Sequence, residues 1–331
     1  MKALQIPQPH QVRVIDLPVP AAGPGEILLQ ICYVGFCGSD LNTFRGRNAM
    51  AKPAVIPGHE IGAVIAAVGP DVPAQFRPGL VVTANPYTNC GHCAACRAGR
   101  YNACENNETL GVQRDGAMRE FLVLPWQKVI PAEGISVRDA ALIEPMSVGF
   151  HAVDRAGVGD NDTVLVIGCG MVGLGAVVRS LRRGATVIAA DIDPGKLALA
   201  RELGAAYAFD TRSTWQDLPA PSVVIEAVGS EPTYRLAIEQ AAFCGRVACI
   251  GYAKSDVTLP TGLIVKKELA VLGSRNATPS DFEAVIRCIR TGGLPLDRFI
   301  SGIVRPEEAQ EALARWDADP GKVYRILTQW K

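Results

Sequence analysis

The sequence has no excess of charge of either sign. Its 331 residues include 33 Lys and Arg and 33 Asp and Glu, so the formal net charge is zero. Proteins that bind nucleic acids or anionic membranes usually carry a basic surplus. The balance therefore argues against both kinds of partner, and a small-molecule substrate is expected.

Long apolar runs are also missing. The apolar runs are of strand length, and none approaches the roughly 20 residues that a transmembrane helix needs. Residues 1–7 lack the apolar core and the small-residue cleavage site of a signal peptide. These absences predict a cytoplasmic protein. Its length, with 48% hydrophobic and 20% charged residues, predicts an ordinary globular chain of two domains.

Four of the ten cysteines form a cluster. The cluster has the pattern C-x2-C-x2-C-x7-C and comprises Cys90, Cys93, Cys96 and Cys104. A reducing compartment disfavours disulfides, and four thiolates on one tight loop complete a tetrahedral zinc shell. The pattern predicts a structural zinc lobe over residues 88–106, with a redox pair or an iron–sulfur cluster as rival interpretations. The scattered cysteines are interpreted as buried small side chains, namely Cys32, Cys169, Cys244, Cys249 and Cys288.

The pattern of apolar residues changes along the chain. Residues 1–145 carry short alternating or apolar segments, such as 26–34 and 60–68, broken by Gly and Pro, which predicts a β-rich domain. Beyond Asp162, predicted strands alternate with helices, and this alternation indicates an α/β domain with a doubly wound parallel sheet. The segments in question are strands at 163–167, 186–190, 223–228 and 247–250 and helices at 172–183 and 195–203.

A glycine motif joins the first strand and helix of the α/β region. Glycines at these positions permit a tight turn and close approach of a pyrophosphate, which the helix N-terminus attracts. Asp191 follows about 20 residues later, where an acid is expected at the ribose hydroxyls. Its charge would repel a 2′-phosphate, so NAD is preferred to NADP. Asp193 is the alternative acid, but it is better explained as a helix cap before Pro194. The motif reads Gly168, Cys169, Gly170, Met171, Val172 and Gly173.

A second candidate metal site lies in the β-rich region. Taken separately, Cys37 could be a small buried residue, His59 a hydrogen-bonded loop histidine and Glu144 a helix-capping acid. Together with Glu60, they supply a thiolate, an imidazole and carboxylates. That donor set matches a catalytic zinc with one position left for water or substrate.

With these motifs, the chain resembles the zinc-dependent medium-chain dehydrogenase/reductases, in the polyol and sugar-acid branch that includes sorbitol dehydrogenase. The resemblance covers nearly the whole chain and implies a Rossmann domain beside a groES-like catalytic domain. The implied boundaries are 1–147 for the catalytic domain, 148–292 for the Rossmann domain and 293–331 for a C-terminal return to the catalytic domain. A homodimer or homotetramer is also implied. The four-cysteine cluster and the glycine motif both carry the resemblance. The other segments that carry it are 34–40 (VGFCGSD), 57–60 (PGHE), 144–149 (EPMSVG) and 272–278 (LGSRNAT).

The resemblance also implies roles for the candidate zinc site. Cys37 and His59 would bind the catalytic zinc, and Glu60 and Glu144 compete for the third protein position. The carboxylate that is not bound would hold the metal's water or contact the substrate. Ser39 would start a proton relay from the alcohol.

Of two further positions, one departs from the pattern of the family and one has a role that the family suggests. Asn42 stands where many relatives have His, so a relay that ends on histidine is not assumed. Lys196 would reach the ribose, as in family members, or is a surface lysine.

The implied activity is oxidation of a secondary hydroxyl to a ketone by hydride transfer to NAD. The 272–278 segment is most similar to bacterial L-galactonate dehydrogenase-like enzymes, which favours a sugar acid such as L-galactonate or L-gulonate. Arg275 in that segment could bind a substrate carboxylate, or else hold the cofactor or a neighbouring subunit. The alternatives are a dehydrogenase of neutral polyols such as sorbitol and a non-catalytic dinucleotide-binding protein.

Overall fold

The computed structural model describes residues 1–213 and 218–331. Its internal contacts divide the chain into two units, Met1–Glu144 with Thr278–Lys331, and Pro145–Ala277. Within the described residues, no helix is long and apolar enough to cross a membrane. The resemblance placed the boundaries at 147/148 and 292/293 instead. The structure therefore places α9 (Pro279–Arg290) in the first unit, whereas the resemblance placed it in the Rossmann domain. In the first unit, the Arg290 side chain lies near Gly134.

The first unit is built on a sheet of order β14-β15-β3-β4-β5-β7, with β6 also paired to β3. The long strand β3 (Glu26–Phe36) is central, because β4, β6 and β15 all pair with it in antiparallel register. Side chains alternate between the two faces of a strand, and those of Ile27, Leu29 and Ile31 are buried in the core of this unit. The strands are β1 (Lys2–Gln5), β2 (Arg13–Asp16), β4 (Glu60–Val68), β5 (Val81–Ala84), β6 (Phe121–Pro125), β7 (Val129–Pro131), β14 (Gly302–Val304) and β15 (Ile326–Gln329).

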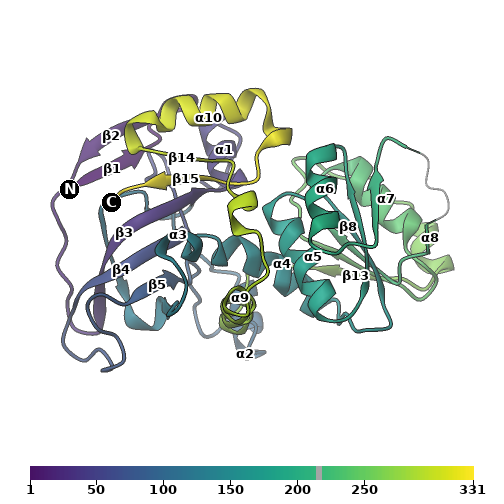
Figure 1. The fold of residues 1–331 in the computed structure, drawn as a ribbon, viewed down its shortest axis with the longest axis horizontal. Helices are drawn as coiled ribbons and strands as arrows, with labels where there is room; N and C mark the ends of the chain where they lie inside the picture. Colours follow the sequence, from purple (N-terminus) through teal and green to yellow (C-terminus); the bar gives the residue numbers. More distant parts are fainter. Residues whose placement is uncertain (214–217) are drawn as a thin grey trace. The chain divides into compact units, whose positions relative to one another are not determined.

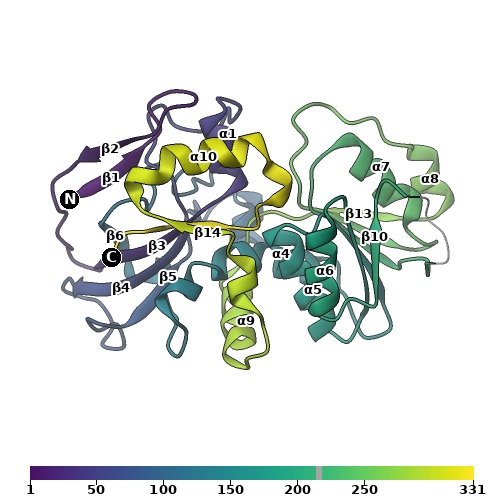
Figure 2. The same ribbon diagram turned by 45° about the horizontal axis from the view of Figure 1, so that its top comes forward.

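The C-terminal residues complete this core. Figures 1 and 2 show α10 beside α1, and its Leu313 and Trp316 pack in the same apolar cluster as Phe44. β15 then pairs with the end of β3, where Ile326 lies opposite Phe36. The predicted β-rich domain and the return of 293–331 to it are both present in this unit. Its helices are α1 (Gly38–Phe44), α2 (Ala94–Arg97), α3 (Val137–Ala140), α9 and α10 (Ala309–Ala318).

The second unit contains the predicted parallel sheet, in the order β10-β9-β8-β11-β12-β13. Helices α5 and α6 cover one face and α7 and α8 the other, as Figures 1 and 2 show. The strand order reverses between β8 and β11, and ligands of such sheets bind outside the carboxyl ends of the strands at that point. The elements are β8 (Thr163–Ile167), β9 (Thr186–Asp191), β10 (Tyr207–Asp210), β11 (Val223–Glu226), β12 (Arg246–Cys249), β13 (Ala270–Gly273), α4 (Ile143–Arg155, which begins in the first unit), α5 (Met171–Arg182), α6 (Pro194–Glu202), α7 (Glu231–Gln240) and α8 (Thr261–Lys266).

Most predicted elements are present within one or two residues of their expected ends. The strand predicted over 223–228, for example, ends two residues early, at Glu226. It ends there because the backbone N–H groups of Val228 and Gly229 turn back and donate to the Glu226 carboxylate, at 2.9 and 2.8 Å. Cys244 was predicted to be buried, and this is wrong. The helix α7 stops at Gln240, so Cys244 lies exposed in the following turn, with a left-handed backbone (φ 58°).

Candidate metal and dinucleotide sites

The pairing of β3 with β4 brings three predicted ligands together. Gly35 lies opposite Glu60 in this antiparallel pair, so Cys37, just after β3, lies at the same end as His59, just before β4. One ligand atom from each of Cys37, His59 and Glu60 lies within 4.8 Å of the others. A glycine is required at position 35, because a Cβ atom there would overlap the Glu60 carboxylate.

These side chains are buried without the hydrogen bonds that burial normally demands. His59 is 5% exposed and Glu60 is fully buried. His59 Nδ1 and both Glu60 oxygens have no hydrogen-bond partner within the described part of the chain. An unsatisfied buried polar atom is costly, whereas a thiolate, an imidazole and a carboxylate are all ligands of zinc. The group therefore fits a zinc ion.

Electrostatics within the group favour the forms that bind a metal. Burial raises the pKa of the Cys37 thiol, but the contact with His59 and its charge outweigh burial, so the pKa falls below its usual value. Burial lowers the pKa of His59, and Cys37 more than reverses this shift. Burial raises the pKa of Glu60 well above its usual range, although Arg325 opposes the shift. A cation bound here would stabilise both the thiolate and the carboxylate.

Arg325 reaches this group from the segment before β15, and sequence reasoning missed it. Its side chain is 4% exposed, and its Nε lies 3.0 Å from Glu60 Oε2 in an ion pair that lacks hydrogen-bond geometry. Its Nη1 donates to the carbonyl oxygen of Phe36 at 2.6 Å. The guanidinium therefore holds the end of β3 and the Glu60 carboxylate at once. Nothing local in the sequence near position 325 indicates this contact, which spans 265 residues along the chain.

Glu144 lies near the group without being one of its three members. Within the residues that the structure describes, the ligand atoms that lie within 4.8 Å of one another do not include the Glu144 carboxylate. Its charge nevertheless contributes to the raised pKa of both His59 and Glu60. The phenol of Tyr87, a residue that sequence reasoning missed, donates to Glu144 Oε1.

Ser39 and Asn42 lie on α1, directly after Cys37. The Ser39 hydroxyl is buried and lacks a hydrogen-bond partner among the described residues, so it can donate to or accept from a ligand. Asn42 is half-buried on the same helix.

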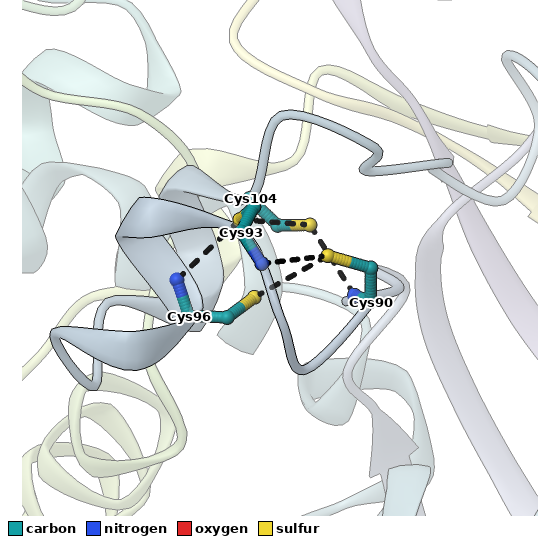
Figure 3. A group of neighbouring side chains, drawn as sticks. All are labelled: Cys90, Cys93, Cys96 and Cys104. Carbon is teal, nitrogen blue, oxygen red and sulfur yellow. Dashed lines mark hydrogen bonds between the residues drawn. The ribbon is translucent and has the colours of Figure 1, made fainter.

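The four clustered cysteines form a second group of ligand atoms within 4.8 Å of one another. Figure 3 shows their sulfur atoms turned toward a common centre, with Cys90 Sγ 4.0 Å from Cys96 Sγ and Cys93 Sγ 3.9 Å from Cys104 Sγ. Backbone N–H groups of the same loop point at the sulfurs, such as Cys93 N–H at Cys90 Sγ (3.4 Å). Such donors, led by His92 N–H, lower the pKa of the Cys90 thiol to about 5. The donor set fits a closed tetrahedral zinc shell.

The glycine motif has the geometry of a phosphate-binding turn. Gly168 has a left-handed backbone (φ 91°), and Gly170 is the N-cap of α5, so Met171 and Val172 open the helix. A Cβ atom at Gly173 would overlap the carbonyl oxygen of Gly168. The helix N-terminus and the turn can therefore approach a pyrophosphate closely.

The predicted ribose-binding acid ends β9 beside this turn. Asp191 Oδ2 accepts from Cys169 N–H at 2.7 Å, and its Oδ1 accepts from Asp193 N–H at 2.9 Å. Asp193 is the N-cap of α6, as predicted, and accepts from Lys196 N–H at 2.9 Å. The Lys196 side chain is buried, so it is not an ordinary surface lysine. Arg275 is half-buried, two residues after the last strand of this unit.

Comparison with known proteins decides the family. The alcohol dehydrogenase GroES-like domain matches residues 23–134, and the zinc-binding dehydrogenase model matches residues 172–291. The chain is 33% identical to L-galactonate-5-dehydrogenase of Escherichia coli K12, over 91% of both chains. It is 31% identical to a sorbitol dehydrogenase of Halalkalibacterium halodurans, over 82% of this chain and 83% of that one. The chain belongs to the zinc-dependent medium-chain dehydrogenases.

These matches confirm the predicted family and its polyol and sugar-acid branch. They also confirm the prediction that the chain is an oxidoreductase that uses zinc and NAD(P). Solved structures share the fold of this dehydrogenase over 99% of its length. An alcohol dehydrogenase of Escherichia coli CFT073, complexed with NADH, superposes with a TM-score of 0.91 at 28% identity and 99% coverage of that chain. A protein of Sinorhizobium meliloti 1021, assigned to the zinc-binding dehydrogenases and bound to NADP, gives 0.90 at 28% identity and 98% coverage.

Proposed function

We propose that this dehydrogenase oxidises a secondary hydroxyl of a sugar acid, of the L-galactonate or L-gulonate kind, to the ketone. The substrate loses a proton and a hydride, and NAD accepts the hydride to give NADH. The observation that carries the proposal is the buried group of Cys37, His59 and Glu60, which offers one ligand atom from each residue within 4.8 Å of the others. In the described part of the chain, His59 Nδ1 and both Glu60 oxygens also lack a hydrogen-bond partner.

In this proposal, Cys37 and His59 hold a catalytic zinc, and Glu60 is the third ligand. Glu60 is preferred to Glu144 because its carboxylate lies within the group of ligand atoms. Zinc, when bound, acts as a Lewis acid that lowers the pKa of an alcohol. The Ser39 hydroxyl, which lacks a hydrogen-bond partner among the described residues, relays the alcohol proton: it takes up that proton as it passes its own outward. Asn42 is not a base, so the proton leaves α1 by another route.

A second, structural zinc is proposed for the four-cysteine lobe. Four thiolates leave no open coordination position, so this ion would stabilise the loop and take no part in the reaction. The buried Cys93, Cys96 and Cys104 hold the centre of the lobe.

NAD is the proposed hydride acceptor, in preference to NADP. Asp191 ends β9 beside the glycine turn, and its carboxylate disfavours a 2′-phosphate. One solved relative carries NADH and another carries NADP, so the relatives do not favour either cofactor. The preference for NAD therefore rests on Asp191. We also propose a homodimer or homotetramer, as the family resemblance implies.

The sugar-acid assignment depends on Arg275 and on the relative that acts on L-galactonate. A guanidinium binds a carboxylate through two parallel hydrogen bonds, which a neutral polyol does not offer. The sorbitol dehydrogenase relative favours a second candidate, oxidation of a neutral polyol, at nearly the same identity.

The deciding experiment measures NADH formation by the zinc-loaded enzyme with paired substrates, L-galactonate and L-gulonate against galactitol and sorbitol. We expect turnover of the acids and not of the polyols. Arg275→Ala is expected to raise the KM of the acids about 10-fold or more, as the loss of a charged hydrogen bond predicts. Turnover of the polyols alone would assign the second candidate, and an unchanged KM for the acids would remove Arg275 from substrate binding.

A further inference from the structure

Glu226 ends β11 as a fully buried carboxylate in the second unit. One of its oxygens, Oε1, accepts from the backbone N–H groups of Val228 and Gly229, at 2.9 and 2.8 Å, and from the Thr233 hydroxyl at 2.8 Å. The other oxygen, Oε2, is buried and has no hydrogen-bond partner among the described residues. Burial of a carboxylate is costly unless donors compensate it. The three donors at a single oxygen fasten the loop over residues 227–229 onto Glu226.

This loop lies against the glycine turn that can approach a pyrophosphate. A Cβ atom on Gly168 would lie 2.5 Å from Val228 Cγ2, so the Val228 side chain fills the space that the missing side chain leaves. Val228 is still 50% exposed, and it therefore presents an apolar surface beside the glycine turn. Gly168 follows β8 and Val228 follows β11, and the strand order reverses between these two strands. Sheets of this kind bind their ligands at that point.

The 227–229 loop is also packed on its other side, against the segment that follows β12. A Cβ atom on Gly229 would overlap backbone atoms of Tyr252, and one on Gly251 would overlap the backbone nitrogen of Gly229. The Tyr234 hydroxyl donates to the carbonyl oxygen of Gly251 at 2.5 Å and holds that segment in turn. A displaced loop would therefore disturb either the glycine turn or this segment.

We infer that Glu226 is a positioning residue for the dinucleotide, whose Oε1 atom holds the 227–229 loop against Gly168. The inference rests on the proposed function, because it concerns how NAD is held, but it does not depend on which alcohol is oxidised. Without this oxygen, the N–H groups of Val228 and Gly229 would lose their acceptor, which costs free energy. The loop would then rearrange toward other partners, and the surface beside the glycine turn would change.

The test uses the full-length, zinc-loaded enzyme and measures the Kd of NADH by fluorescence titration, together with the thermal midpoint. Glu226→Met removes the acceptor and keeps a similar volume. It is expected to raise the Kd of NADH about 10-fold, as the loss of hydrogen bonds to a charged group predicts. Glu226→Gln keeps one oxygen for the three donors and places its amide nitrogen where Oε2 has no partner. It should bind NADH within about threefold of the unmodified enzyme, even where its thermal midpoint falls.

Asp162 provides the matched control. It is a carboxylate of the same sheet, but it lies just before β8, at the edge opposite the carboxyl ends of the strands. It accepts from Gly159 N–H at 2.8 Å and from the Ser222 hydroxyl at 2.7 Å, and it pairs with Arg246. Asp162→Asn is expected to lower the thermal midpoint and to leave the Kd of NADH unaltered.

A merely structural role for Glu226 would give a different pattern. Glu226→Met would then lower the thermal midpoint, as Asp162→Asn does, and would bind NADH with an unchanged Kd. Glu226→Gln that binds NADH as weakly as Glu226→Met would also overturn the inference, because the acceptor oxygen would then not matter. If Glu226→Met folds poorly, Thr233→Val removes one of the three donors and keeps the carboxylate. It should raise the Kd of NADH about threefold, and an unchanged Kd would overturn the inference.

Two further measurements separate this inference from the proposed function. The unmodified enzyme is titrated with NADPH as well, and tighter binding of NADPH would contradict the proposed preference for NAD. The same variants would then be compared with NADPH, which tests Glu226 in the same way. Turnover of neither acids nor polyols would contradict the proposed substrate and leave the binding comparison intact. In each case, equal Kd values for the unmodified enzyme and Glu226→Met would overturn the inference.

Discussion

The two candidate metal groups of the first unit are assembled in different ways. The four cysteines of the lobe come from one loop over residues 90–104, and backbone N–H groups of that loop surround their sulfurs (Figure 3). The other group takes ligands from the end of β3 and the start of β4, and its Glu60 pairs with Arg325 from far along the chain. A local group can form as a unit, whereas the other exists only once the sheet has formed.

From this difference we expect the largest loss of activity when a ligand of the group assembled from distant segments is replaced. Cys37→Ala is expected to reduce kcat/KM by about 1000-fold, or about 4 kcal/mol of transition-state stabilisation, because it removes a ligand of the proposed catalytic zinc. Zinc analysis should show about one ion fewer per chain than in the unmodified enzyme. A variant that keeps both full zinc content and turnover would show that Cys37 is only a small buried side chain.

Arg325 tests whether support from a distant segment stabilises the same group. Arg325→Met leaves Glu60 buried without its counter-charge, and breaking a buried ion pair in this way costs about 3 kcal/mol. Urea unfolding should report this loss of stability, and Arg325→Lys should recover part of it because the positive charge is retained. Equal stability of all three proteins would mean that the bound metal alone balances the Glu60 charge.

The same contrast explains what could be predicted from the sequence. The cysteine lobe and the glycine turn were readable because their residues are close in the chain and their spacing fixes the geometry. Cys37, His59 and Glu60 were recognised only in combination and by resemblance, since β3 pairs with β4 across an intervening loop. Contacts set by tertiary packing left no local pattern, and this applies to both Arg325 and Tyr87.

Local turn chemistry accounts for the smaller errors. The strand β11 stops at Glu226 because the backbone folds onto that carboxylate, and an apolar Val228 beyond it suggested a longer strand. Cys244 is exposed because it lies in the five-residue connection between the end of α7 at Gln240 and the start of β12 at Arg246. In both places the apolar pattern continued after the regular backbone had ended.

The smallest effect on turnover is expected from the local group. Cys93→Ser removes a buried thiolate of the lobe, so zinc content should fall by about one ion per chain, as it does for Cys37→Ala. Because the lobe is closed and its supporting donors are its own N–H groups, kcat should fall less than about 10-fold. Hydrogen exchange should show lost protection in residues 88–106 and unchanged protection in β3 and β4. Loss of protection in those strands as well would show that the lobe supports the sheet, and the two groups would then not be independent.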